Sequence, residues 1–216
     1  MTLIFVGDPM CSWCYGFGKE LTGLMALHPG LPLDIVVGGV RAGATDVLDD
    51  AGRQFRLAHW ARVEASSGLP FNRAAFTARR GFVYDTEPIC RAVVAVRRVA
   101  PQADLLAVFR ALQAAFYVDG LDTTDGRILA TVAAAALRTQ GHDIGTDAVH
   151  AAWLAPDTVA ATQADFHRAR GLGVRSFPAL LLETPDGIHE VSPGYAHVAA
   201  LDQRLRTLLD RYAASN

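Results

Sequence analysis

The sequence is poor in cysteine, in net charge and in long apolar runs, and each shortage excludes a class of protein. Three cysteines in 216 residues are too few for the disulfide scaffold of a small secreted domain. The 20 Lys and Arg residues nearly balance the 22 Asp and Glu residues, so the formal charge of −2 indicates neither nucleic acid nor an anionic membrane surface as a partner. No apolar stretch approaches the roughly 20 residues of a membrane span. We therefore expect no nucleic-acid partner and no membrane partner.

The composition also bounds the size and the compartment of the protein. The length of 216 residues suits one large domain or a core domain with an embedded insertion, and the hydrophobic content of 51% is enough to bury a substantial core. The segment Met1–Val6 has neither the basic leader nor the small-residue cleavage site of a signal peptide. Together with the scarcity of cysteine, this predicts a protein of the reducing cytoplasm.

The motif Cys-Ser-Trp-Cys at Cys11–Cys14 carries most of the chemical information. It comes after a β-prone run, Leu3–Val6, and a Gly-Asp-Pro turn, and it begins a helical pattern. The apolar residues of that pattern lie on one face of a helix: Cys14, Phe17, Leu21, Leu24 and Met25.

This placement predicts thiol–disulfide exchange. Residues three apart on a helix lie about 5–6 Å apart, within the range that a disulfide requires. The unpaired N–H groups at the helix N-terminus stabilise a thiolate at Cys11, whereas Cys14 falls on the buried stripe. Cys11 is then the nucleophile and Cys14 the resolving cysteine. The alternatives are a buried thiol pair and half of a zinc site, but a zinc site needs about four ligands and no second Cys-x-x-Cys or His pair appears. We expect no metal and no bound cofactor, with glutathione a possible redox partner.

The remaining elements follow the order β-α-β, a gap, then β-β-α. His28–Gly30 ends the first helix, Leu33–Val40 is predicted to be a buried strand, and Ala179–Leu182 pairs through a Pro-Asp-Gly turn with Ile188–Val191. The last element is a helix with its apolar face at Val198, Leu201, Leu205, Leu208 and Tyr212.

The gap is predicted to be helical throughout. The expected helices are Asp50–Ser66, one with Pro88 in its first turn after a Thr86 or Asp85 cap, one through Leu105–Phe116, Ile128–Leu137, and Asp157–Arg170 ended by Gly171. Residues 1–40 and 174–216 therefore form one discontinuous domain, and residues 41–173 form a helical insertion that packs against it.

This order, with Cys-x-x-Cys at the start of the first helix, resembles an α/β thioredoxin fold carrying a large all-helical insertion. The chain is similar to the DsbA-like family, and within it to the cytoplasmic FrnE-like protein-disulfide isomerases. Three stretches carry the resemblance: Asp8–Phe17, Tyr84–Ala92 and Gly173–Pro178. It implies that Pro178 is a cis-proline beside the two cysteines and that the backbone of Phe177 pairs with an extended substrate.

Other residues near the motif have two interpretations each. Trp13 either contacts bound polypeptide or packs against the inserted helices. Asp8 either caps the turn, which we favour, or moves a proton to or from Cys14. Arg41 follows the second strand and is more typical of an ordinary solvated side chain than of a partner to the Cys11 thiolate. Cys90 lies among apolar residues on an expected helix, as a small buried hydrophobic side chain does.

The sequence thus predicts a thiol–disulfide oxidoreductase or protein-disulfide isomerase. Its expected partners are disulfide- or thiol-containing polypeptides and a cellular thiol reductant. Two alternatives remain: a glutathione-dependent isomerase or transferase of the related helical-insertion branch, and a redox-sensing chaperone. The former proteins typically carry serine in place of the first cysteine, and both sulfurs are present here.

Overall fold

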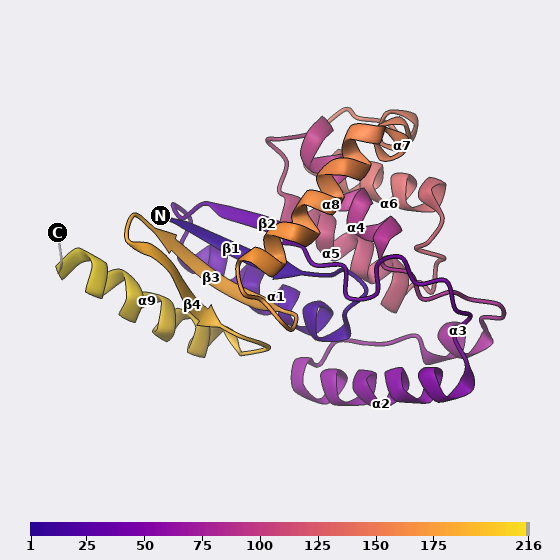
Figure 1. Cartoon of the computed structure of the whole chain (residues 1–216), viewed down its shortest axis with the longest axis horizontal. Helices are drawn as coiled ribbons and strands as arrows, with labels where there is room; N and C mark the ends of the chain where they lie inside the picture. Colours follow the sequence, from indigo (N-terminus) through magenta and orange to yellow (C-terminus); the bar gives the residue numbers. More distant parts are fainter. Residues whose placement is uncertain (215–216) are drawn as a thin grey trace.

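The computed structural model describes residues 1–214 and is built around a mixed sheet (Figure 1). The strands of this sheet are β1 (Thr2–Gly7), β2 (Leu33–Val37), β3 (Ala179–Thr184) and β4 (Gly187–Ser192), in the order β2-β1-β3-β4. β1 pairs parallel with β2 and antiparallel with β3, and β3 pairs antiparallel with β4. The predicted β-α-β and β-β-α halves are therefore confirmed and share one sheet.

Alternation along β1 divides the core between the two faces of the sheet. Leu3 and Phe5 belong to the larger apolar cluster, and Ile4 and Val6 belong to the smaller one. Helices α1 (Ser12–Leu27) and α9 (Val198–Ala214) lie on the first face, and α8 (Pro156–Gly171) packs beside β2 on the second (Figure 1). α8 falls within the range predicted to be the insertion, although it covers the sheet.

The segment between β2 and α8 is helical, as the sequence predicted. Its helices are α2 (Asp50–Ser67), α3 (Arg73–Ala78), α4 (Glu87–Val99), α5 (Leu105–Tyr117), α6 (Gly126–Thr139) and α7 (Thr146–Leu154). The short helices α3 and α7 were not predicted. α2 ends at Gly68, whose φ of 70° is a left-handed conformation that glycine adopts without strain.

The predicted end of β2 was wrong, whereas the predicted start of α4 is confirmed. β2 ends at Val37 and not at Val40, because the amide of Val40 donates to the Asp8 carboxylate and so leaves the sheet. α4 begins as predicted, with Thr86 at its N-cap position and Pro88 in its first turn, and of the two predicted capping side chains Thr86 makes no capping hydrogen bond. The Asp85 carboxylate accepts from Glu87 N at 2.9 Å instead, while the Thr86 hydroxyl accepts from Arg41 N.

An ion pair joins three of these elements. The guanidinium of Arg97 on α4 donates to both carboxylate oxygens of Asp165 on α8, at 3.0 and 2.9 Å. Asp165 also accepts from Val37 N, and Arg97 donates to the carbonyl of Ile35. The insertion is therefore bonded directly to β2, close to the end of the strand where the turn before α1 also lies.

Candidate active site

The Cys-x-x-Cys motif lies at the N-terminus of α1, as predicted. Cys11 is the N-cap residue, with extended backbone angles and no side-chain capping bond, and its amide donates to Asp8 O at 3.0 Å. Cys11 is partly exposed, whereas Cys14 is completely buried, and both are free thiols. The sulfur that solvent reaches is therefore the one at the positive end of the helix.

The environment of Cys14 keeps it protonated. Burial is the largest cause that raises its pKa well above the ordinary value, followed by a hydrogen bond with Cys11 and by the charge at Cys11. The Asp8 amide, 3.5 Å from the Cys14 sulfur, acts in the opposite direction. Cys14 is consequently a thiol while Cys11 is free, and the two sulfurs lie within hydrogen-bonding reach of each other.

The loop before β3 approaches the same sulfur. The Cys11 thiol lies 3.6 Å from the carbonyl oxygen of Phe177, and the Phe177–Pro178 peptide bond is cis. The Phe177 ring lies against Gly38, where a Cβ atom would come within 2.2 Å of the ring. Only glycine at position 38 leaves room for this ring. Two loops that are far apart in the sequence thus meet beside Cys11.

Asp8 is fully buried, and its carboxylate holds the turn, the first of the two roles considered for it. Its carboxylate oxygens accept from Met10 N at 2.8 Å and from Val40 N at 2.7 Å, so it holds the turn. Burial raises its pKa from 3.8 to about 6, although hydrogen bonds from Thr86, Met10, Val40 and Cys90 oppose that shift. Burial therefore places near Cys14 an acid whose pKa lies closer to neutral pH than that of an ordinary aspartate.

Met10, which precedes Cys11, is held by residues of the insertion. Its carbonyl oxygen accepts from the hydroxyl groups of Tyr84 and Tyr117, and its sulfur accepts from Thr123. The sequence analysis missed these residues, because nothing in a local pattern indicates which tyrosines a fold brings to a given carbonyl. Tyr84 did stand in one of the three stretches that resembled the family, but without an assigned role.

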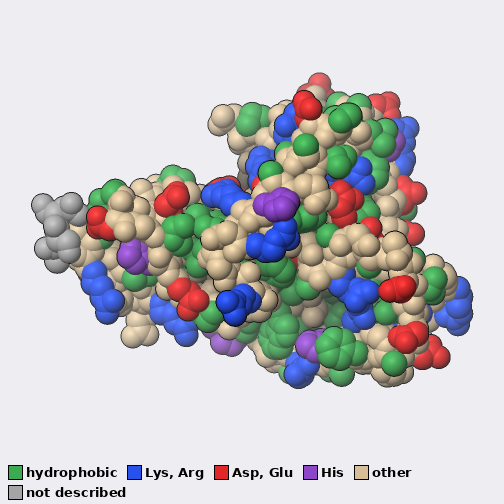
Figure 2. Space-filling model, in the orientation of Figure 1, with side chains coloured by type: hydrophobic (Ala, Val, Ile, Leu, Met, Phe, Trp, Pro, Cys, Tyr) green, Lys and Arg blue, Asp and Glu red, His purple; other side chains and the backbone are tan. Residues whose placement is uncertain are grey.

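A pocket of about 380 Å³ opens beside the motif. It is lined by Trp13 from α1, Ser66 from α2, Ser176 and Phe177 from the cis-proline loop, and Pro193, Gly194 and Tyr195 from the segment before α9. Hydrophobic side chains gather in the hollow between the sheet and α2 in the space-filling view (Figure 2). The structure thus brings Trp13 and Phe177 to one pocket, while Pro178 is buried next to it.

The buried carboxylate of Glu20, which the sequence analysis missed, holds the Tyr195 side of this pocket in place. Glu20 on α1 accepts from Val198 N at 2.9 Å and from the Tyr195 hydroxyl at 3.3 Å. Tyr195 in turn packs against Trp13, with ring centroids 5.6 Å apart. Trp13 therefore packs on the segment before α9, and it shares its pocket with Ser66 of the inserted helix α2.

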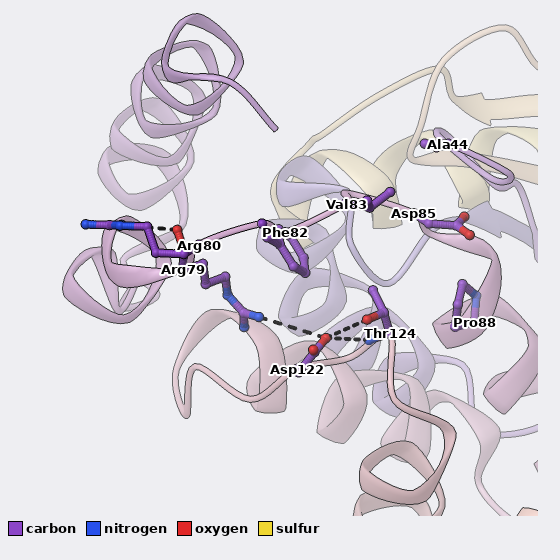
Figure 3. A pocket seen from close by; sticks show the side chains of 10 residues that line it. Ala44, Arg79, Arg80, Phe82, Val83, Asp85, Pro88, Asp122 and Thr124 are labelled. Atoms are coloured by element: carbon purple, nitrogen blue, oxygen red, sulfur yellow. Dashed lines mark hydrogen bonds and ion pairs between the residues drawn. The ribbon is translucent and has the colours of Figure 1, made fainter. Parts of the chain in front are cut away.

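A second hollow, of about 490 Å³, lies on the insertion and takes no part in this arrangement. Figure 3 shows Arg79 pointing toward Asp122, which is also bonded to Thr124, while the Arg79 guanidinium lies over the Phe82 ring. None of its lining residues belongs to the Cys-x-x-Cys turn or to the cis-proline loop. The pocket beside the Cys-x-x-Cys motif is therefore the smaller of the two.

Arg41 and Cys90 have the exposure and the burial that the sequence predicted for them. Arg41 is exposed, and Cys90 is fully buried on α4 with its sulfur hydrogen-bonded to Asp8. Within residues 1–214, no group of three or more His, Cys, Asp or Glu side chains is arranged to hold a metal ion. No helix in the same range has the length and apolar character needed to cross a bilayer.

Comparison with known proteins relates the chain to disulfide isomerases and disulfide reductases. No protein-family profile and no curated protein sequence matches the chain. Among solved structures, a predicted protein disulfide isomerase from Nitrosomonas europaea is 31% identical, with 97% of this chain and 98% of that chain covered and a TM-score of 0.86.

Two further structures bear on the chemistry and the fold. The cytosolic disulfide reductase DsbM from Pseudomonas aeruginosa is 25% identical over 97% of this chain and 99% of its own, with a TM-score of 0.77, and it has also been solved with GSH. A 2-hydroxychromene-2-carboxylate isomerase is 15% identical over 100% of this chain and 98% of its own, with a TM-score of 0.63, and this likeness concerns the fold alone.

Proposed function

The chain belongs to the DsbA-like family of thioredoxin-fold thiol–disulfide oxidoreductases, and on this premise we propose that Cys11 and Cys14 are its redox-active pair. The observation that carries the proposal is the asymmetry of the two sulfurs. Cys11 is partly exposed at a helix N-terminus, and Cys14 is buried one turn behind it with a raised pKa. The Cys11 thiol is thus accessible to a substrate disulfide, and the Cys14 thiol remains protonated until it resolves the mixed disulfide.

The reaction proceeds by two exchanges. The Cys11 thiolate attacks one sulfur of a substrate disulfide, forming a mixed disulfide and releasing the other substrate sulfur as a thiolate. Cys14 loses its proton and attacks the Cys11 sulfur, which releases the second substrate thiolate and forms the Cys11–Cys14 disulfide. The substrate gains two electrons and the enzyme pair loses two. Oxidation of a substrate dithiol follows the same steps in reverse.

Asp8 is placed to serve the second exchange. Its pKa of about 6 means that it is ionised near neutral pH, and its amide already contacts the Cys14 sulfur. We propose that the carboxylate accepts the proton that Cys14 must lose. This role adds to the structural one, because the same carboxylate holds Met10 N and Val40 N.

The pocket lined by Trp13 and Tyr195 supports a polypeptide as the substrate. It presents aromatic and small side chains beside Cys11, as a site for an extended apolar segment requires. The Phe177 backbone borders it on the side of the cysteine. We propose that Trp13 and Phe177 contact the substrate and that Pro178 holds the Phe177 backbone in place.

We further propose a reducing direction, a cytoplasmic location and glutathione as the thiol partner. The support is the 25% identical cytosolic disulfide reductase and its structure with GSH. Glutathione in this scheme reduces the Cys11–Cys14 disulfide, with two glutathione thiols oxidised to one glutathione disulfide per turnover.

Cysteine replacements test the proposal. Cys11→Ser should abolish insulin reduction by glutathione, and Cys14→Ser should accumulate mixed disulfides at Cys11. Cys90→Ser is the matched control, since it makes the same change at a sulfur outside the motif and should retain most of the activity per folded molecule. Full activity of Cys11→Ser would refute the proposal.

A further inference from the structure

Two buried tyrosines donate to a single backbone carbonyl, that of the peptide bond between Met10 and Cys11. The Tyr84 hydroxyl lies 2.5 Å and the Tyr117 hydroxyl 2.6 Å from Met10 O. Both distances are at the short end for a hydroxyl donor. Tyr84 precedes α4 and Tyr117 is the last residue of α5, so both donors come from the helical insertion.

Packing holds both rings in place. Tyr117 is completely buried, and it stacks on Tyr15 with ring centroids 4.7 Å apart and lies edge-on to Trp60. The Arg56 guanidinium lies 4.1 Å from the centre of the Tyr84 ring. The two hydroxyl groups also lie within hydrogen-bonding reach of each other, so they act on the Met10 carbonyl as a pair.

Both hydroxyls remain donors throughout the physiological pH range. Burial raises the pKa of Tyr84 and of Tyr117 above the ordinary value, and a charge at Cys11 raises both further. The carbonyl that they hold belongs to the peptide bond of the Cys11 nitrogen, so both hydroxyl dipoles act directly beside Cys11.

We propose that Tyr84 and Tyr117 are positioning residues that set the reactivity and the redox equilibrium of Cys11 through the carbonyl of Met10. The inference rests on the proposed redox role of Cys11. Two donors draw electron density from a carbonyl that is bonded to the Cys11 nitrogen, and so lessen its repulsion of a thiolate on that residue. The two hydrogen bonds also fix the backbone of Met10, and so the position of Cys11 at the N-terminus of α1.

The rest of Met10 is held in the same way. Its amide donates to Asp8, and its sulfur accepts from Thr123. Met10 is buried, so water cannot replace a lost tyrosine hydroxyl without entering the core. Loss of one phenol therefore weakens the stabilisation of the Cys11 thiolate and shifts the equilibrium toward the Cys11–Cys14 disulfide.

The test uses Tyr84→Phe, Tyr117→Phe and the double variant. Tyr15→Phe is the matched control, because it removes a hydroxyl from the same aromatic cluster that donates to Pro70 O and not to Met10. The Cys11–Cys14 equilibrium is measured against mixtures of glutathione and glutathione disulfide. The pH titration of the Cys11 thiolate is followed by its ultraviolet absorbance.

Tyr84→Phe and Tyr117→Phe should each shift the Cys11–Cys14 equilibrium constant roughly three- to tenfold toward the disulfide. Each should also move the titration of the Cys11 thiolate to higher pH. Tyr15→Phe should do neither. If the variants lose unfolding free energy but keep the wild-type equilibrium and titration, the tyrosines only pack and the inference is wrong. An equal shift in Tyr15→Phe would overturn it too. Failure of the wild-type pair to close at all would remove the proposed function and this inference with it.

Discussion

The amide nitrogen of Asp8 lies 3.5 Å from the sulfur of Cys14, and the carboxyl group of the same residue is fully buried. Its pKa rises from 3.8 in the unfolded chain to about 6 in the folded one. Between those pH values the folded chain binds more protons than the unfolded chain. The stability that depends on Asp8 is therefore lost as the pH rises through about 6.

This linkage predicts the behaviour of Asp8→Asn, which carries no charge at any pH. The unfolding free energy of the variant, relative to wild type, should rise by roughly 2–3 kcal/mol between about pH 4 and pH 7. Urea unfolding at several pH values measures it. A difference between the two proteins that does not change with pH would contradict the raised pKa.

Asp165 should be a large contributor to stability. Its removal takes away the acceptor of the buried amide of Val37 and of the partly buried Arg97 guanidinium. Asp165→Ala should lower the unfolding free energy by about 3–5 kcal/mol. The matched control is Asp147→Ala, which breaks the exposed ion pair with Arg127 and should change stability little. Similar small losses in both variants would show that the Arg97–Asp165 pair does not join the insertion to the sheet.

Gly38 should tolerate no side chain. An added Cβ would lie 2.2–2.9 Å from the Phe177 ring, so Gly38→Ala forces the ring and its loop away from Cys11. The unfolding free energy should fall by roughly 1–3 kcal/mol, and insulin reduction by the folded protein should fall as well. Gly30→Ala, where nothing lies within 4 Å of the new atom, should leave both unchanged. Normal activity of Gly38→Ala would mean that the position of Phe177 does not matter.

Trp13 should distinguish polypeptide substrates from small ones. Trp13→Ala removes the aromatic wall shared with Tyr195, so kcat/KM for insulin should fall about tenfold, while reduction of a small aromatic disulfide falls less. Phe55→Ala changes an exposed aromatic residue on α2 that does not line the pocket, and should have no effect. If kcat/KM fell equally for both substrates, Trp13 would only pack within the protein and would not contact the polypeptide.

Local patterns in the sequence were enough to predict the redox motif and the elements that carry it. The strand-turn-helix context of Cys11, the buried stripe through Cys14 and the order of strands are properties of short segments, and the structure confirms them. Cys90 was expected to be buried for the same reason, and it is.

Residues that meet across long stretches of chain were not predictable in this way. Tyr84 and Tyr117 bond Met10 from 74 and 107 residues away, and Glu20 bonds Val198 across 178. No periodicity records such a contact, because it depends on how the insertion packs. Asp8 was weighed mainly as a turn residue, since sequence alone does not reveal the burial that raises its pKa.

The central claim is that Cys11 and Cys14 form a reversible disulfide, and mass spectrometry of protein equilibrated with glutathione and glutathione disulfide tests it most directly. We predict a single intramolecular bond between Cys11 and Cys14 that opens as the glutathione fraction rises, with Cys90 a free thiol throughout. If Cys11 and Cys14 remained thiols under oxidising conditions, or if Cys11 carried glutathione that Cys14 never displaced, the account would be contradicted.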